Sequence, residues 1–296
     1  MKILFLSHVK LSLSLVVILV IGSSCARWGK PLELRLANGE TTTLNEIIND
    51  LKDNDTKIRT LKGRGTFTLK TPQIDTIYQL HQSDIEFYYP DYLRAVGRKY
   101  TAVVLKLTCY KDEFLIELPT EKNYYYSKGG EFFEHSDTEV TPLDIFREML
   151  FSGNWEKIKP QQIEISPIAT AEQNQTVEIK IYSDTTHKFL QRKIIVQGKP
   201  WVILETERYS PSGALIAKTK RDNYRVSEDG VKFPSIIHCE FPQENAFMTI
   251  KLNKCSFNEP VKPYTTQLKK LIYQLEREKY TPLEKTNSNQ ERTKIG

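Results

Sequence analysis

The sequence predicts a mainly β (α+β) protein: a single curved antiparallel sheet that forms an unclosed barrel, lidded by helices, with an added C-terminal helix. Three observations lead to this fold class. Long stretches alternate apolar and polar residues with period two, and short turn-rich segments join them. The 15 Tyr and 13 Phe, against 3 Met, suit pleated and half-buried strands. Strands and helices do not alternate along the chain, which argues against a parallel sheet.

Residues 1–24 have the layout of a bacterial lipoprotein signal peptide. Lys2 and Lys10 precede the apolar run 11–21, which is shorter than the roughly 18–20 residues that a transmembrane helix needs. The small residues Gly22-Ser23-Ser24 directly before Cys25 resemble a lipobox, so Cys25 is the predicted site of lipidation. Two or more acyl chains on Cys25 would anchor the protein stably to a membrane. The alternative is an ordinary signal peptide, or a short uncleaved anchor, next to a coincidental cysteine.

A short tether, residues 25–42, is predicted to lead into a folded domain spanning 43–260. Thr43-Leu44-Asn45-Glu46 has the spacing of a capping box, in which Thr43 caps a helix and Glu46 reaches back to it. The helix that starts there has an apolar stripe that can dock on a sheet, formed by Leu44, Ile47, Ile48 and Leu51.

From Ile58 onward the pattern changes to period two, and it predicts a first series of antiparallel strands. Two of them run through Phe67 and through Ile85, and further strands are expected at 92–98, 103–110, 113–118 and 123–126. Gly63-Arg64-Gly65 lies inside the first strand, where glycine indicates a bulge or a close approach of two backbones.

A central helix is predicted to begin at Thr141-Pro142-Leu143-Asp144, with threonine as the cap, proline in the first turn and an acid at the positive end of the helix dipole. Ser152-Gly153 should end this helix. The large residues Phe151 and Trp155 next to that end either fold back into the core or stay exposed, where they would touch a ligand. The apolar face of the helix consists of Leu143, Phe146, Met149 and Leu150.

A second strand series follows, at 163–168, 176–183, 188–196, 201–209, 215–224, 236–241 and 246–257, with short turns between neighbours. Such a meander pairs strands that are adjacent in sequence. The segment 261–280 is predicted to be an amphipathic C-terminal helix, which packs on the domain or contacts a partner or the membrane surface. Residues 281–296 are polar and predicted to be disordered.

The cysteines do not predict a disulfide framework. A hairpin turn at 242–245 would set Cys239 opposite Met248, so Cys255 would lie too far away for a bridge. Each cysteine lies on the same face of its predicted strand as apolar residues two or four positions away. This pattern indicates that Cys109, Cys239 and Cys255 are buried free thiols.

Signatures of catalysis are missing from the sequence. It contains no G-x-S-x-G, Walker loop, G-x-G-x-x-G or H-E-x-x-H motif, and its histidines lack metal-ligand spacing. Glu205 and Glu207 are interpreted as part of a solvated outer face. The mature chain has 40 Lys and Arg against 37 Asp and Glu, without a basic block, so a nucleic-acid partner is not indicated. We therefore expect no cofactor, no metal and no enzyme activity.

The inner face of the sheet is predicted to be strongly apolar. Such a face is either sealed by helices as core or left partly open for an apolar ligand. The candidate ligand-binding residues are Phe67, Leu69, Ile85, Phe87, Leu105, Leu107, Val202 and Leu204 of the sheet, with Phe146 and Met149 of the central helix.

Several segments together resemble the LolA/LolB-like lipoprotein-carrier superfamily over roughly residues 44–260. They are 61–67 (LKGRGTF), 87–94 (FYYPDYLR), 209–213 (YSPSG), 230–234 (GVKFP) and 257–260 (FNEP). The resemblance implies an unclosed β-barrel lidded by helices, with a cavity for the acyl chains of lipoproteins in transit. A lipidated member would be a receptor anchored in the outer membrane.

Three functional hypotheses follow from the sequence, of which an enzyme ranks last. The first is a periplasm-facing lipoprotein of the bacterial envelope, anchored through Cys25, that binds acyl chains, lipid or another apolar ligand, with a possible role in lipoprotein localisation to the outer membrane. A periplasmic protein is a further possible partner. The second is a structural or sensory lipoprotein, non-catalytic as well, with a filled core and a protein-binding surface.

Overall fold

The structure is a computed structural model that describes residues 33–36, 39–71, 74–128, 142–168, 175–260 and 268–283. The predicted signal peptide, Cys25, much of the predicted tether and residues 284–296 lie outside the described residues. So does Thr141, the predicted cap of the central helix.

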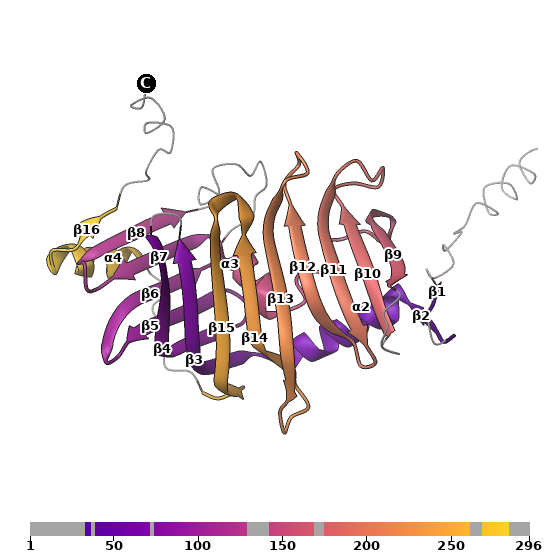
Figure 1. Cartoon of the computed structure of the whole chain (residues 1–296), viewed down its shortest axis with the longest axis horizontal. Coiled ribbons are helices and arrows are strands. Elements are labelled where there is room, and N and C mark those ends of the chain that lie inside the picture. Colours follow the sequence, from indigo (N-terminus) through magenta and orange to yellow (C-terminus); the bar gives the residue numbers. More distant parts are fainter. Residues whose placement is uncertain are drawn as a thin grey trace, which may run out of the picture.

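Most of the described chain forms one large curved sheet of 14 strands that does not close into a barrel (Figure 1). Its strands lie in the order β16-β8-β7-β6-β5-β4-β3-β15-β14-β13-β12-β11-β10-β9, and every pair is antiparallel except β16 with β8. The predicted fold class is thereby confirmed. The strands are β3 (Thr60–Thr71), β4 (Ile74–Tyr88), β5 (Tyr92–Lys99), β6 (Ala102–Tyr110), β7 (Glu113–Leu118), β8 (Asn123–Lys128), β9 (Ile163–Ile168), β10 (Gln175–Tyr182), β11 (Leu190–Gly198), β12 (Val202–Tyr209), β13 (Leu215–Val226), β14 (Lys232–Phe241), β15 (Ala246–Phe257) and β16 (Thr281–Pro282).

One long-range pairing organises this sheet. Strand β3, the first long strand, pairs with β15, the last one, so the two strand series meet in the middle of the sheet. Strands β8 and β9 consequently lie far apart, toward opposite ends. The chain between them has to pass from one end of the sheet to the other, and it carries helix α3 (Pro142–Leu150).

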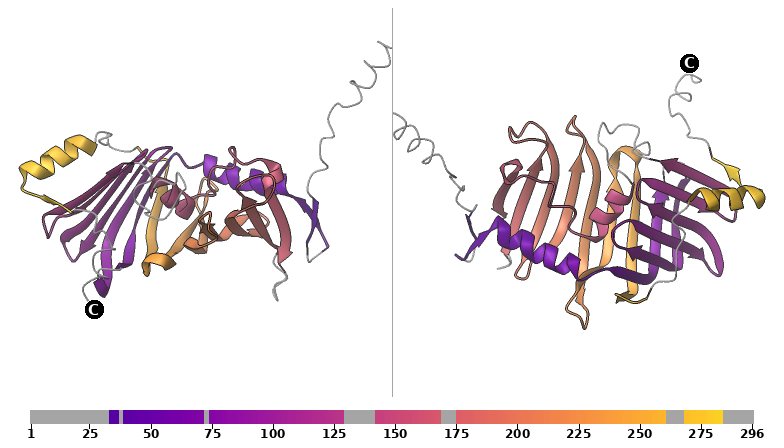
Figure 2. Two further views of the ribbon diagram at one scale, coloured as in Figure 1. Left: turned by 90° about the horizontal axis from the view of Figure 1, so that it is seen from above. Right: turned by 180° about the vertical axis from the view of Figure 1, so that it is seen from behind.

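Helices α2 (Leu44–Thr56) and α3 lie against the same face of the sheet (Figure 2). The predicted capping box of α2 is present: the amide of Glu46 donates to Thr43 Oγ1 at 3.2 Å, and the amide of Thr43 donates to Glu46 Oε2 at 3.0 Å. Helix α4 (Leu268–Arg277) lies within the predicted C-terminal helix. Short 3-10 helices occur at Pro160–Gln162 and Pro242–Glu244.

Two core clusters lie between the sheet and these helices. The larger one joins α3 to strands β3–β7, β14 and β15, and the second joins α2 to strands β9–β12. A third, small cluster holds α4 against β7 and β8. Phe114 belongs to the large cluster and its neighbour Leu115 to the small one, so α4 packs on the opposite face of β7.

The predicted tether is partly structured. Strands β1 (Glu33–Arg35) and β2 (Thr41–Thr43) form a two-stranded antiparallel sheet, and Leu36 is buried in the cluster under α2. At the other end of the chain, Thr281–Pro282 forms β16, although disorder was predicted from residue 281. Both short segments gain order from contacts with the parent fold, because neither could form a stable sheet alone.

The cysteine prediction is confirmed for two of the three thiols. Cys239 pairs with Met248 as predicted, all three cysteines are free, and Cys109 and Cys239 are buried. The prediction was wrong for Cys255, whose side chain is exposed. The alternation of apolar and polar residues shows on which face of the sheet a side chain lies. It does not show whether other residues cover that face.

The two aromatic residues after α3 fold back into the core. Phe151 is buried beside Phe87, with ring centroids 4.6 Å apart, and Trp155 is buried in the cluster under α2. The close backbone approach predicted at Gly65 is also present, since a Cβ atom there would lie 1.9 Å from the carbonyl oxygen of Lys251 in β15. A side chain at this position would therefore force the two central strands apart.

Candidate functional site

The predicted ligand-binding residues of β3–β6 and α3 come together in the large core cluster. Five of them are buried and three are half-buried against the cluster. The buried ones are Phe67, Ile85, Phe87, Leu107 and Met149, and the half-buried ones are Leu69, Leu105 and Phe146. Helix α3 and the residue after it place five buried side chains over this region, so that packed protein atoms cover these positions; the five are Leu143, Ile145, Met149, Leu150 and Phe151.

Val202 and Leu204 are not brought into this group. Both are half-buried and outside the core clusters, whereas Ile203 between them is buried in the cluster under α2. The inner face of β12 is therefore opposite to the one expected. Three consecutive apolar residues give no alternation from which to choose a face, and only the position of α2 decides it.

An open groove lies near these core residues, where strands β14 and β15 separate. Their pairing ends at Ile236↔Lys251. Beyond that point β14 stays paired with β13 as far as Val226↔Lys232, while β15 stays paired with β3 as far as Phe257↔Leu61. The space between them has a volume of about 720 Å³, within the range of roughly 300–1,000 Å³ that is typical of small-molecule sites.

The groove has an apolar part that continues the core. Phe233, Leu252 and Ile85 line it and belong to the large core cluster, and Phe257 packs against that cluster. The rings of Phe233 and Phe257 meet edge to face with centroids 5.6 Å apart. Cys255 also lines the groove, which explains why its side chain is exposed.

Charged residues line the rest of the groove. Arg64 donates to Asp84 at 2.8 Å, and Lys62 lies 3.5 Å from Glu259. Arg225 and Lys254 also line it, and among the described residues neither forms an ion pair with a carboxylate.

Of the predicted site residues, the groove contains only Ile85. The sequence carried one signal for the groove, the bulge-forming glycines of β3. The pairing of β3 with β15 is shifted between Leu252 and Lys254, close to the place where β15 leaves β14. The separation itself depends on partners more than a hundred residues apart along the chain, which no local pattern reveals.

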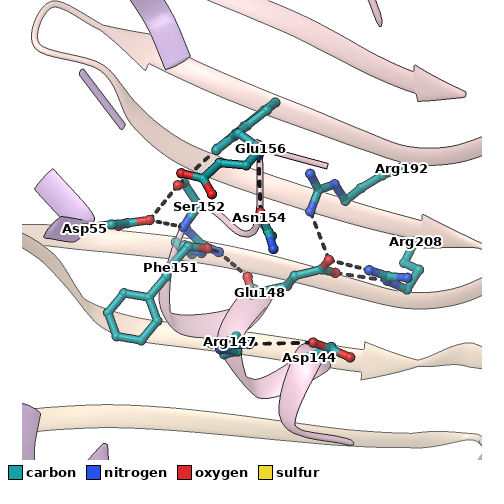
Figure 3. Close-up of polar contacts among 12 residues, drawn as sticks. Asp55, Asp144, Arg147, Glu148, Phe151, Ser152, Asn154, Glu156, Arg192 and Arg208 are labelled. Atoms are coloured by element: carbon teal, nitrogen blue, oxygen red, sulfur yellow. Dashed lines mark hydrogen bonds and ion pairs between the residues drawn. The ribbon is translucent and has the colours of Figure 1, made fainter. Parts of the chain in front are cut away.

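A polar cluster lies between the two large core clusters and holds α3 to the sheet (Figure 3). Glu148 of α3 accepts hydrogen bonds from Arg192 of β11 at 2.9 Å and from Arg208 of β12 at 3.0 Å. Arg221 of β13 donates to the carbonyl oxygens of Glu148 and Phe151, the latter at 2.7 Å. Three neighbouring strands therefore bind the C-terminal half of one helix.

The loop after α3 is bound to α2 in a similar way (Figure 3). Asp55 accepts hydrogen bonds from the amide of Ser152 at 2.8 Å and from its hydroxyl at 2.5 Å. Trp155 Nε1 donates to the same hydroxyl at 3.1 Å. Burial raises the pKa of Asp55 above its ordinary value, although the hydrogen bonds from Ser152 act in the opposite direction.

The pKa of Glu148 lies below its ordinary value despite the burial of this residue. Desolvation would raise the pKa, but the charges of Arg192 and Arg208 and the hydrogen bonds that they donate together lower it. These hydrogen bonds clamp α3 and the loop after it to strands β11–β13 and to α2.

The expectation for Glu207 was wrong. Its side chain is buried, not solvated, because Lys193 lies 2.5 Å and Lys218 2.7 Å from its carboxylate. Burial would raise the pKa of Glu207, but hydrogen bonds from Lys193, Lys218 and Tyr209 lower it to about 2. Glu205, 2.7 Å from Lys218, belongs to the same network. Long lysine side chains can cover a carboxylate on a sheet surface, and the sequence pattern does not show this.

Within the described residues, no group of three or more His, Cys, Asp and Glu side chains is arranged to hold a metal ion. In the same part of the chain, the helices are too short or too polar to cross a membrane.

The open curved sheet with helices α2 and α3 over one face is the architecture that the sequence predicts. No protein-family model matches the chain. A search of curated proteins finds no significant match either.

The solved structures that are similar to this chain include the following three, all at low identity. A domain classed as an outer membrane lipoprotein-sorting protein, from Vibrio parahaemolyticus, has 11% identity and a TM-score of 0.48, covering 77% of this chain and 96% of that one. A DUF1329 family protein from Desulfovibrio piger has 13% identity and a TM-score of 0.49, covering 74% and 92%. A LolA superfamily protein from Nitrosomonas europaea has 10% identity and a TM-score of 0.46, covering 73% and 94%. These are similarities of fold, and they assign no ligand and no role to any residue.

Proposed function

We propose that this protein is a non-catalytic lipoprotein of the bacterial envelope that binds an acyl chain or another apolar ligand in the groove between β14 and β15. The observation that carries the proposal is the separation of these strands after Ile236↔Lys251, which leaves about 720 Å³ of open space beside the core. Half-buried Phe257 gives this space an apolar wall, and Phe233 and Leu252, each 4% exposed, form its floor. Covering such a surface with hydrocarbon is favourable by about 0.8 kcal/mol for each buried methylene group.

The groove also modifies the predicted ligand-binding set. Ile85 is retained because it lies in the lining of the groove, where it is 1% exposed and is proposed to form the floor under the ligand. The other predicted residues of β3–β6 and α3 are proposed to support the ligand site as packed core, and Val202 and Leu204 of β12 are left out of it.

Binding of a fluorescent fatty-acid analogue tests the proposal. The protein is the full chain with Cys25→Ser, delipidated, so that its own predicted acylation does not supply the ligand. We expect saturable binding at micromolar concentration, and co-purifying lipid in native mass spectrometry before delipidation. Cys255→Trp places a large side chain in the groove and should weaken binding at least tenfold, while the matched control Cys255→Ser should bind like the parent protein.

Two results would overturn the proposed ligand site. One is the absence of binding at high micromolar analogue. The other is equal binding by the folded Cys255→Trp variant, which would place the ligand elsewhere.

The membrane anchor is proposed separately, from Gly22-Ser23-Ser24-Cys25. Cells labelled with radioactive palmitate should incorporate label into the wild-type protein and not into Cys25→Ser. We expect the labelled protein in the outer-membrane fraction, facing the periplasm, where it could take part in lipoprotein localisation. Label that persists in Cys25→Ser would contradict the assignment of this cysteine.

A second candidate function has a specific observation in its favour. The residues predicted to line a central cavity are covered by the buried side chains of α3 and the residue after it. A structural or sensory lipoprotein with a filled core and a protein-binding surface would have this packing. Failure of every ligand in the binding assay would favour this function over the first.

A further inference from the structure

The charges around the groove between β14 and β15 are unevenly paired. The acidic residues that line the groove have basic partners: Asp84 is bound by Arg64 and by Arg98, both at no more than 2.8 Å. Glu86 lies 3.6 Å from Arg94, and Glu259 lies 3.5 Å from Lys62. The carboxylates of the lining are therefore already neutralised by neighbouring cations.

Two cations of the same lining have no such partner within the described part of the chain. Arg225 of β13 is exposed, and its guanidinium makes a long hydrogen bond, from Nη1 to the backbone carbonyl oxygen of Asn253 at 3.5 Å. Lys254 of β15 is exposed as well, and no carboxylate lies within ion-pair distance of it in the described residues. Two positive charges are thus left over at the groove.

These cations come from opposite flanks of the groove. Arg225 comes from β13, which remains with β14, and Lys254 comes from β15, which remains with β3. The hydrogen bond from Arg225 Nη1 to the carbonyl oxygen of Asn253, another residue of the lining, places the guanidinium beside the groove. Apolar side chains of both flanks, Phe233 and Leu252, line the same space.

We infer that the groove takes a single-chain amphiphile with an anionic head group, whose carboxylate or phosphate contacts Arg225 and Lys254 while its chain lies over Phe233, Leu252 and Phe257. This inference rests on the proposed function and adds the ligand class. Charge complementarity selects the head group, because a guanidinium and an ammonium bind carboxylate or phosphate oxygens through charge-assisted hydrogen bonds. The volume of about 720 Å³ suits one chain with its head group.

Competition between ligands of matched chain length tests the inference. A bound fluorescent fatty-acid analogue is displaced from the full chain carrying Cys25→Ser by dodecanoate, dodecyl phosphate, dodecanol or inorganic phosphate. We expect both anionic amphiphiles to bind at least tenfold more tightly than dodecanol, and inorganic phosphate not to compete. The stronger of the two anions distinguishes a phosphate head group, as in a lysophospholipid, from the carboxylate of a free fatty acid.

Variants connect this preference to the two cations. Arg225→Gln and Lys254→Gln should each weaken the anionic ligands about fivefold and leave dodecanol unchanged, since an exposed charge contact is worth this much at low salt. Lys99→Gln removes an exposed cation outside the groove lining and should change nothing. All three positions are exposed, so the variants should fold. The anionic preference should also shrink as salt is raised from 50 to 500 mM.

The outcomes separate the two proposals. Equal affinity for dodecanol and dodecanoate, or anion binding that is unchanged in both cation variants, would overturn the inference and leave the proposed function standing. Displacement by an extended apolar peptide in preference to every amphiphile would overturn the inference too, and would indicate pairing with the open edges of β14 and β15. If the parent protein binds neither the analogue nor any amphiphile, the proposed function itself fails.

Discussion

Replacing Glu148 by Gln should strongly destabilise the protein. This carboxylate is the acceptor that joins α3 to two strands of the sheet, through Arg192 at 2.9 Å and Arg208 at 3.0 Å. Glutamine keeps the shape and one acceptor oxygen but loses the negative charge. The side chain of Arg192 is only 7% exposed, so its positive charge would remain in a poorly solvated place without a counter-ion.

The size of the loss follows from that burial. Removing one partner of a buried ion pair costs about 3–5 kcal/mol, because the charge left behind is uncompensated. Arg208 is 20% exposed and can regain water, and glutamine retains one hydrogen bond, so the lower end of this range applies. We expect the free energy of unfolding to fall by about 3 kcal/mol. Such a loss is a large part of the total stability of an ordinary domain.

Urea denaturation at neutral pH measures this loss, with Glu156→Gln as the matched control. Glu156 is exposed just after α3, and its replacement should change the free energy of unfolding by less than about 0.5 kcal/mol. The double variant Glu148→Gln with Arg192→Met removes the stranded charge and should be more stable than Glu148→Gln alone. A loss below about 1 kcal/mol for Glu148→Gln, or no recovery in the double variant, would refute the view that paired buried charges clamp α3.

Three further predictions concern the sheet and its first helix. Since the pKa of Glu207 lies at about 2, below its ordinary value of 4.5, its ion pairs stabilise the fold fully above pH 4.5 and lose their effect as the pH falls toward 2. The free energy of unfolding should fall by about 2 kcal/mol over this range, because the partial exposure of the lysines weakens the ion pairs. Acidification should therefore lower the melting temperature of Glu207→Gln less than that of the wild type. Gly65→Ala should lower the free energy of unfolding by about 3 kcal/mol or more, because its Cβ would meet the backbone of Lys251. Gly213→Ala should lower it by about 1 kcal/mol, because there is open space at this position but φ is 84°. Equal losses for the two variants in urea denaturation would contradict this reasoning. Thr43→Ala removes the cap of α2 and should lower the free energy of unfolding by about 1 kcal/mol. Thr43→Ser is the control, because serine retains the capping hydroxyl. Identical melting temperatures for the two variants would contradict the role of this cap.

Local features of the fold could be predicted because short-range physical chemistry determines them. Ile163–Ile168 and Ala246–Phe257 have the strand boundaries expected from alternation, and α2 begins with the expected capping box. The register that sets Cys239 opposite Met248 followed from the position of one turn. In each case the deciding interactions lie within one strand, one helical turn or one hairpin.

Predictions failed where a distant element decides the environment of a residue. Val202 and Leu204 were assigned to the inner face of β12, but α2 packs over Ile203 instead. Glu207 was expected in water and is covered by the lysines of the neighbouring strands. Cys255 was expected in the core and faces an open groove.

For this protein, the sequence by itself determined the class of fold, because alternation of period two, capping residues and turn residues act through neighbours in the chain. It also carried the motifs of the LolA-like resemblance and the cysteine of the predicted anchor. Only the tertiary structure decided where space remains for a ligand. The pairing of β3 with β15 brings the two chain halves together, and the separation of β14 from β15 opens the groove and leaves Arg225 and Lys254 beside it. Both arrangements depend on packing between strands that are far apart in the sequence, so no single stretch of residues determines them.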